Sequence, residues 1–214
     1  MISENNNSVI YSKKLASDVN ALVEGVSSEQ LFILTDEHTK IHCLPLLQSE
    51  GAMKNAKVYT MPCGDHYKTI ETVVEIWKFL GENCGTRKSM LINLGGGVVT
   101  DLGGFVANTF KRGIRFINIP TTLLSMVDAA VGGKTGINFN GLKNEIGVIN
   151  PAETVVIYPD FLRSLDTENL LSGYAEMLKH GLLSSEEEMK KLNKFDARKP
   201  DFDLLAELIK TSIE

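Results

Sequence analysis

Residues 90–105, MLINLGGGVVTDLGGF, contain the clearest strand-to-helix pattern of the chain. This stretch opens with a short apolar run, 90–94, which is typical of a buried strand in a parallel sheet. Glycines 95–97 follow at the carboxyl end of that strand, and an amphipathic run behind them predicts a helix. Such glycines let a phosphate approach the backbone, and the helix amino terminus offers unpaired N–H groups. Thr100 replaces the third glycine of G-x-G-x-x-G, so a glycine-rich turn without a ligand stays an alternative.

Further short apolar runs on both sides of this stretch predict strands at residues 31–35, 58–61, 114–119 and 154–158. Residues 69–80 predict a helix, because Ile70, Val73, Val74, Trp77 and Leu80 recur at three- and four-residue spacing. Alternating strands and helices indicate an α/β fold with a largely parallel sheet.

From Phe161 onward the apolar spacing is helical, with helices expected at 170–183, 186–192 and 202–213. We therefore place a boundary near Pro159. It separates an α/β domain, residues 1–159, from the first helices of an incomplete helical domain, residues 160–214.

Composition narrows the classes of partner. The chain has 214 residues, 27 acidic against 22 basic, and a net charge of -5, so it offers no general positive field for nucleic acid or anionic lipid. No window is long and apolar enough for a membrane span, and no secretory leader precedes the fold, which predicts a cytoplasmic protein. Three widely spaced cysteines do not indicate a disulfide framework.

A second group of chemically active residues follows the strand at 114–119. Asp128, Lys134, Lys143 and Asn144 stand in stretches otherwise rich in small and apolar residues. Two lysines and an amide can hold a phosphate, and the alternative is an ordinary surface loop. The string 132–135, GGKT, resembles the end of a P-loop but lacks that motif's first glycine, so we exclude a P-loop.

A third group lies on the first helix beyond the boundary. Glu176 and His180 are four residues apart and share one helix face, from which a carboxylate and an imidazole can reach one metal ion. A solvated surface pair is the alternative interpretation.

Taken together and in this order, these segments resemble the 3-dehydroquinate synthase family. The resemblance rests on six motifs, at residues 95–105, 112–113, 120–128, 132–134, 143–147 and 173–179. It implies a Rossmann-like NAD-binding domain, a helical domain and an active site between them. The implied enzyme is a carbon–oxygen lyase of the shikimate pathway. It converts 3-deoxy-D-arabino-heptulosonate 7-phosphate to 3-dehydroquinate and phosphate, with NAD and a divalent metal as cofactors.

The resemblance also implies roles for single residues. The residues implied for NAD are Asp36, Asp65, Lys68, Gly96, Gly97, Asp101, Thr121, Thr122, Lys134 and Lys143, with Asp36 on an adenosine ribose hydroxyl and Asp65 and Lys68 near the adenosine half. Those implied for the substrate are Asp128, Lys134, Asn144 and Lys179. Arg112 is expected to reach the substrate phosphate of a second subunit in a homodimer, and Glu176 to bind zinc or cobalt.

Three departures from the family pattern stand out. Asp65 replaces a glutamate, and His38 stands where relatives often have asparagine. The two metal-binding histidines of the family follow a helix like residues 204–210, and this chain ends at Glu214 before them. We therefore expect an incomplete metal site, an inactive fragment and a bystander role for His180.

Three other functions remain open. Another sugar phosphate cyclase shares the NAD turn, although Lys143 and Asn144 favour dehydroquinate synthase. A metal-dependent polyol or glycerol phosphate dehydrogenase is related in architecture and releases NADH. A non-catalytic NAD-binding module is the third.

Overall fold

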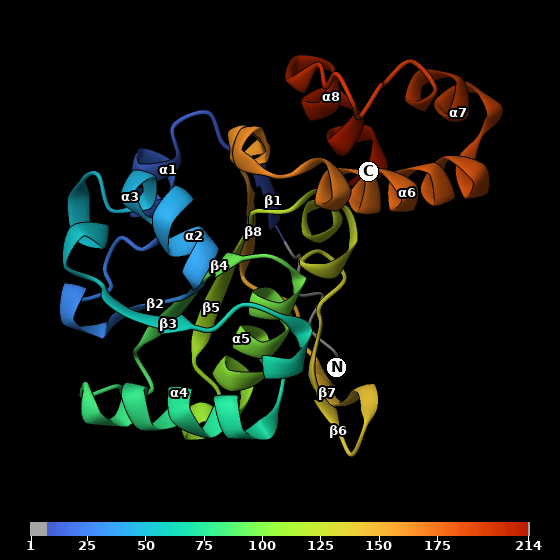
Figure 1. Cartoon of the computed structure of the whole chain (residues 1–214). Coiled ribbons are helices and arrows are strands. Elements are labelled where there is room, and N and C mark those ends of the chain that lie inside the picture. The colour runs from blue at the N-terminus through green and yellow to red at the C-terminus, as the bar shows by residue number, and fades with distance from the viewer. Residues whose placement is uncertain (1–7, 214) are drawn as a thin grey trace, which may run out of the picture.

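The computed structural model describes residues 8–213 as a six-stranded parallel sheet with helices on both faces and a further group of helices above it (Figure 1). The strands are β1 Ser8–Tyr11, β2 Leu31–Asp36, β3 Lys57–Met61, β4 Met90–Gly95, β5 Arg115–Pro120, β6 Lys134–Phe139, β7 Leu142–Ile149 and β8 Thr154–Ile157. The helices are α1 Leu15–Leu22, α2 Glu37–His42, α3 Leu44–Leu47, α4 Ile70–Glu82, α5 Gly97–Thr109, α6 Thr167–Ser184, α7 Glu186–Leu192 and α8 Phe202–Ile213.

The sheet has the order β1-β8-β5-β4-β2-β3, and every neighbouring pair is parallel. The α/β fold expected from the sequence is thus confirmed, and each predicted strand and the helix at 69–80 form within two residues of the expected bounds. Strands β2 and β4 are neighbours in the sheet. From β2 the chain continues to β3 on one side of this pair, and from β4 it continues to β5 on the other side. In open parallel sheets, ligands bind beyond the carboxyl ends of strands at such a reversal.

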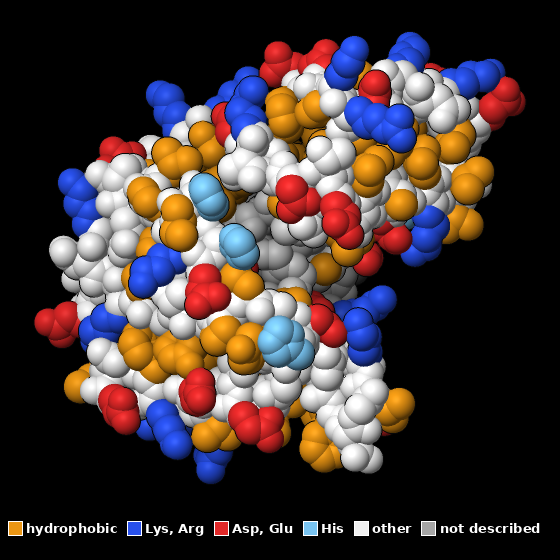
Figure 2. Space-filling view, viewed as in Figure 1, with side chains coloured by type: hydrophobic (Ala, Val, Ile, Leu, Met, Phe, Trp, Pro, Cys, Tyr) orange, Lys and Arg blue, Asp and Glu red, His pale blue; other side chains and the backbone are white. Residues whose placement is uncertain are grey.

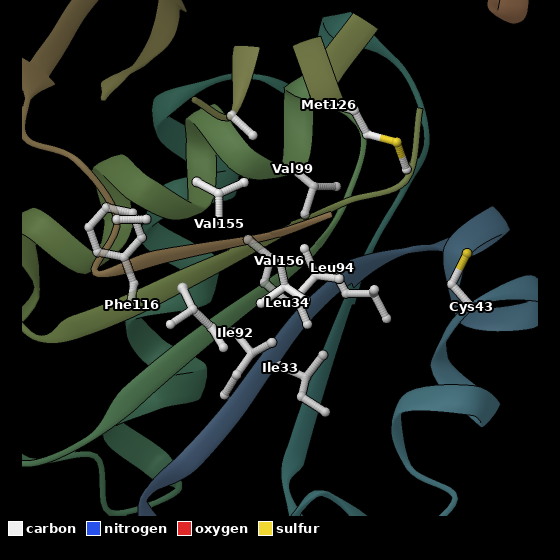
Figure 3. Packing of buried hydrophobic residues seen from close by; sticks show 14 of the residues in the cluster. Ile33, Leu34, Cys43, Ile92, Leu94, Val99, Phe116, Met126, Val155 and Val156 are labelled. Carbon is white, nitrogen blue, oxygen red and sulfur yellow. The ribbon is translucent and has the colours of Figure 1, made fainter. Parts of the chain in front are cut away.

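The core lies on the two faces of this sheet. Figure 1 places α1, α2 and α3 on one side and α4 and α5 on the other. Strand β4 is buried along its whole length because both of its faces are covered. Figure 3 shows Ile33 and Ile92 side by side on one face of the sheet and Val155 on the other face, toward Val99 of α5. This packing fixes the carboxyl end of β4, where the glycines begin.

Two sets of strands were not predicted from the sequence. Strand β1 has only four residues and pairs with β8 at the sheet edge. The second is an antiparallel hairpin of β6 and β7, in a region to which we assigned no strand. Asn140 and Gly141 form its two-residue turn with φ of 50° and 79°, the left-handed geometry that favours Asn-Gly in hairpins. Each strand contains a glycine and β7 is mostly exposed, which hides the alternating pattern of a half-buried strand.

The helical segment follows the sheet through a 3₁₀ turn, Pro159–Ser164. Helix α6 begins three residues before the expected start, because the Asp166 carboxylate accepts a hydrogen bond from the Asn169 amide at 2.9 Å. Helices α7 and α8 occupy the predicted residues. Within residues 8–213 no helix is long and apolar enough to cross a bilayer.

Candidate active site

The glycine turn joins β4 to α5 and leaves open space above the helix start. The Thr121 amide donates to the Gly95 carbonyl at 3.0 Å, which ties the turn to the end of β5. A Cβ placed on Gly97, the first residue of α5, meets only the Ala129 Cβ, at 3.2 Å. On Gly103 of the same helix, a Cβ falls 2.0 Å from the Asn93 side chain. Gly103 therefore serves packing, whereas Gly97 keeps a surface open.

That surface is one wall of a cleft of about 520 Å³ beyond the carboxyl ends of the strands. Of the residues implied for NAD, those that line it are Asp36, Asp65, Lys68, Gly96, Gly97, Asp101, Thr121 and Thr122. Lys134 and Lys143 lie on the hairpin instead. The opposite wall comes from Phe161, Leu165 and the first turns of α6. Figure 2 shows this hollowed face between the sheet and the upper helices, with histidine side chains beside it.

Asp36 ends β2 at the rim of the cleft. Its Oδ1 caps α2, accepting from the Thr39 amide at 2.8 Å and from the Thr39 hydroxyl at 2.9 Å. The Asp36 backbone N–H in turn donates to the Thr39 hydroxyl oxygen at 3.0 Å, which completes a capping box. The cap uses one carboxylate oxygen, so Oδ2 can face a ligand hydroxyl.

Lys68 joins the cleft wall to the hairpin. It is only 4% exposed, and its Nζ donates to Asp101 Oδ2 at 2.5 Å and to Asn144 Oδ1 at 2.5 Å. Burial raises the pKa of Asp101, while the Lys68 ammonium opposes that shift. The family resemblance implies a place for Lys68 near the adenosine half of NAD. The structure places the Lys68 ammonium between Asp101, on the second turn of α5, and Asn144, which the resemblance implies for the substrate.

Contacts of Lys143 and Asn138 also hold the hairpin to the same wall. Lys143 Nζ lies 3.0 Å from Asp65 Oδ2, and the Asn138 amide donates to the Lys68 carbonyl at 2.8 Å. The Asn138 side chain accepts from the Asn144 amide at 3.0 Å. Asn144 has a left-handed backbone, φ 54°, beside an irregularity in the strand pairing. This bend turns the Asn144 side chain back toward Lys68.

Asp128, Lys134 and Lys179 lie within electrostatic range of this group. Asp128 adds to the raised pKa of Asp101 and Lys134 opposes it, although burial and Lys68 have larger effects. The pKa of Lys179 is raised mainly by its hydrogen bond to Glu176, with a smaller contribution from Asp128. The tertiary structure thus brings together residues from α5, the hairpin and α6 that are far apart in sequence.

Glu176 and His180, the two residues considered as metal ligands, are poorly arranged to hold an ion. Glu176 Oε1 accepts from Lys179 Nζ at 2.6 Å and lies 3.4 Å from His180 Nε2. Lys179 is the main reason that the pKa of Glu176 is lowered. His180 Nδ1 is 2.7 Å from the Ser212 hydroxyl. Residues 8–213 contain no group of three histidine, cysteine or acidic side chains placed to hold a metal, whereas a catalytic zinc normally has three protein ligands.

Arg112 does not line this cleft. It is exposed beyond the carboxyl end of α5, in a turn where Lys111 and Arg112 both have positive φ, 53° and 71°. Left-handed backbone in a non-glycine residue costs on the order of 1 kcal/mol or more. Two in succession fix the direction in which Arg112 leaves the body of the protein.

Several residues that line the cleft were not predicted from the sequence. Cys63 follows β3 and Thr39 lies inside the capping box of α2. Asn169 and Ser172 are three residues apart on α6, a spacing that puts both on one face. A polar face next to the strand ends was the available signal on α6, whereas nothing in the local sequence marked Cys63.

Comparison with known proteins agrees with this geometry. A sequence model described as 3-dehydroquinate synthase N-terminal matches residues 58–172. A 3-dehydroquinate synthase of Parabacteroides distasonis is 48% identical over 205 residues, which are 96% of this chain and 58% of that protein. The chain thus spans less than two thirds of the length of this curated relative.

Solved structures show the same fold. The 2-epi-5-epi-valiolone synthase of Streptomyces hygroscopicus, with NAD+ and Zn2+ bound, matches with a TM-score of 0.85 and 27% identity over 100% of this chain and 61% of that one. An iron-containing alcohol dehydrogenase from Thermococcus thioreducens matches at 17% identity with a TM-score of 0.77, covering 97% and 64% of the two chains, and therefore shares the fold alone. The family model and the extent of the sequence identity lead to one conclusion: the chain belongs to the 3-dehydroquinate synthase family.

Proposed function

We propose that this chain provides the NAD site and part of the substrate site of a 3-dehydroquinate synthase, a phosphate-eliminating lyase. The proposed reaction converts 3-deoxy-D-arabino-heptulosonate 7-phosphate to 3-dehydroquinate and phosphate. One observation carries the proposal: an open glycine turn faces a cleft whose wall holds Lys68 between Asp101 and Asn144.

NAD fits the first part of this cleft. Its pyrophosphate would lie over Gly96 and Gly97, at the amino terminus of α5, where open space and unpaired N–H groups favour an anion. Asp36 Oδ2 would accept a hydrogen bond from an adenosine ribose hydroxyl. When bound, NAD supplies the acceptor for a hydride from the substrate and can return it. Asp101 lies one turn beyond Gly97 on α5, and Lys68 contacts Asp101, so both would face the reacting half of the cofactor.

The substrate would be held by donors that surround this group. Asn144 Oδ1 already accepts from Lys68, so the amide Nδ2 is the end free to donate to a substrate oxygen. The ammonium groups of Lys134, Lys143 and Lys179 would offset the charge of a phosphate or carboxylate. Asp128 would accept from a substrate hydroxyl.

The relative from Streptomyces is described with Zn2+ bound, and we propose Glu176 as the residue of this chain that would contact zinc or cobalt. The donor set in residues 8–213 is too small to hold such an ion alone, so no step of the reaction is assigned through it.

We also propose a homodimer in which Arg112 serves the substrate phosphate of the other subunit. Its support is the placement of Arg112, which is exposed, fixed by left-handed backbone and away from the cleft of its own subunit.

A different sugar phosphate cyclase is the second candidate, favoured by the match to the valiolone synthase structure. Phosphate release from the heptulosonate phosphate by the whole protein supports dehydroquinate synthase, whereas no turnover of it favours another cyclase. A dehydrogenase would instead accumulate NADH during turnover, because its hydride does not return to the substrate.

The NAD site can be tested on this chain by calorimetry. We expect wild-type chain to bind NAD and Gly97→Val to lose binding while staying folded, because the added methyl groups occupy the open space over the turn. Gly81→Val is the matched control: Gly81 lies in α4, and a Cβ there meets nothing within 4 Å. Normal NAD binding by Gly97→Val, with circular dichroism showing a native fold, would place the cofactor elsewhere.

A further inference from the structure

Asn138 of β6 has no role in the proposed site, yet its polar groups contact three residues of that site. Its backbone N–H donates to the Lys68 carbonyl at 2.8 Å. Its side-chain Oδ1 accepts from the Asn144 backbone N–H at 3.0 Å. Its Nδ2 donates to the Asp65 carbonyl at 3.2 Å and to Asp65 Oδ2 at 3.3 Å. One half-buried side chain therefore joins the segment before α4 to the hairpin.

These hydrogen bonds occur where the pairing of the hairpin is irregular. The regular pairs on either side are Ile137 with Ile146 and Phe139 with Leu142. Between them a single residue of β6, Asn138, faces the three residues 143–145 of β7. Extra residues in a bulge lose their ladder partners, and the backbone N–H groups among them need other acceptors. The Asn138 side chain supplies the acceptor for the Asn144 N–H, while the Asn138 N–H turns to Lys68.

The contacts of Asn138 require an amide. The Asn144 N–H can only donate, so it needs an oxygen opposite it. The Asp65 carbonyl and carboxylate can only accept, so they need an NH₂ group. Asp65 Oδ2 also lies 3.0 Å from Lys143 Nζ. A carboxylate in place of the Asn138 amide would serve Asn144 but would repel Asp65.

We propose that Asn138 is a positioning residue that sets the places of Asn144 and Asp65. Asn144 has a left-handed backbone, φ 54°, which a residue with a Cβ adopts only when its surroundings hold it there. The Asn138 Oδ1 holds it by binding the N–H of that same residue. In this conformation Asn144 Oδ1 accepts from Lys68 Nζ at 2.5 Å.

The same amide acts on both parts of the candidate site. Through Asn144 it sets a group implied for the substrate, and through Asp65 it sets a group implied for NAD at the wall of the cleft. This part of the inference rests on the proposed function, because the roles of Asn144 and Asp65 come from it. The hydrogen bonds of Asn138 themselves do not depend on the function.

Amide hydrogen exchange, measured by NMR on the ¹⁵N-labelled chain at neutral pH, tests the first link. In Asn138→Ala the Asn144 N–H loses its acceptor and should exchange about three- to tenfold faster. The matched control is Asn150→Ala at the base of the same hairpin, where the half-buried Asn150 side chain donates to the Asn108 side chain. The control also removes one hydrogen bond from the hairpin but should leave exchange at Asn144 unchanged. Unchanged exchange in Asn138→Ala, or equal acceleration by Asn150→Ala, would overturn the proposal.

Asn138→Asp separates the two links. Its carboxylate can still accept from the Asn144 N–H but cannot donate to Asp65. Exchange at Asn144 should therefore stay near that of the wild type. NAD, measured by calorimetry, should bind about three- to tenfold more weakly, because repulsion displaces Asp65. Fast exchange at Asn144 in this variant contradicts the first link, and wild-type NAD affinity contradicts the second.

The two proposals can fail separately. If the wild-type chain binds no NAD, that result counts against the proposed function. Exchange at Asn144 in Asn138→Ala and Asn150→Ala then decides by itself whether Asn138 positions Asn144.

Discussion

Replacing Lys68 with methionine removes the ammonium that joins Asp101 to Asn144 but keeps most of the buried stem. Removal of one partner from a buried ion pair costs about 3–5 kcal/mol. Here the Asp101 side chain is 20% exposed and that of Lys68 is 5% exposed, so water partly solvates the remaining carboxylate. We therefore expect Lys68→Met to lower the free energy of unfolding by about 2–3 kcal/mol at neutral pH. For a chain of this length that corresponds to about 4–12 °C in Tm.

The loss should depend on pH in a defined direction. The pKa of Asp101 is already raised by burial, and loss of Lys68 removes the main opposing cause. A carboxyl whose pKa is raised in the folded state contributes stability below its ordinary pKa, and loses it as pH rises through the folded pKa. The difference between Lys68→Met and the wild type should thus grow as pH rises above about 4.

Urea unfolding at several pH values measures this difference, and Asp101→Asn provides the control. In the Lys68→Met background, Asp101→Asn removes the uncompensated carboxylate, so the double variant should recover part of the lost stability at neutral pH. The reasoning is refuted if the loss is independent of pH and the double variant is no more stable than Lys68→Met.

Two further predictions concern the cleft and its far wall. Bound NAD should slow iodoacetamide labelling of Cys63, which lines the cleft, but not of exposed Cys84. Cys43 should stay unlabelled because burial raises its pKa to about 12. Equal labelling of Cys63 with and without NAD argues against the proposed place of the adenosine half in this cleft. Asp166→Ala should cost about 1 kcal/mol in thermal unfolding by removing the cap of α6. Hydrogen bonds from Asn169 lower the pKa of Asp166, so the stability that this cap contributes is present above the ordinary pKa and is lost as pH falls through the lowered value. If Asp166→Ala destabilises the chain equally in acid, the cap is not the source of the effect.

Local sequence was sufficient for most of the fold. Strand β4 is a run of apolar residues that ends in glycines, and this pattern depends only on its own residues and on burial of both faces. Helices α7 and α8 were predicted at their observed residues because their apolar spacing and end residues are local. The hairpin was missed because β7 is mostly exposed and bends at Asn144, so burial imposes no alternation on it.

For the candidate site, the sequence determined the residue types and their order, and the tertiary structure decided which of them meet. The glycine turn and the run Thr121–Thr122 could be recognised because each lies at the end of its own strand. The contact of Lys68 with Asp101 and Asn144 joins residues 33 and 76 positions apart, so no local pattern could reveal it. It exists because the hairpin folds back along α5 and presents Asn144 to a buried ammonium that needs oxygen partners. In the same way, only packing places Arg112 outside its own cleft and next to the base of the hairpin, because that position depends on how α5 lies against β6.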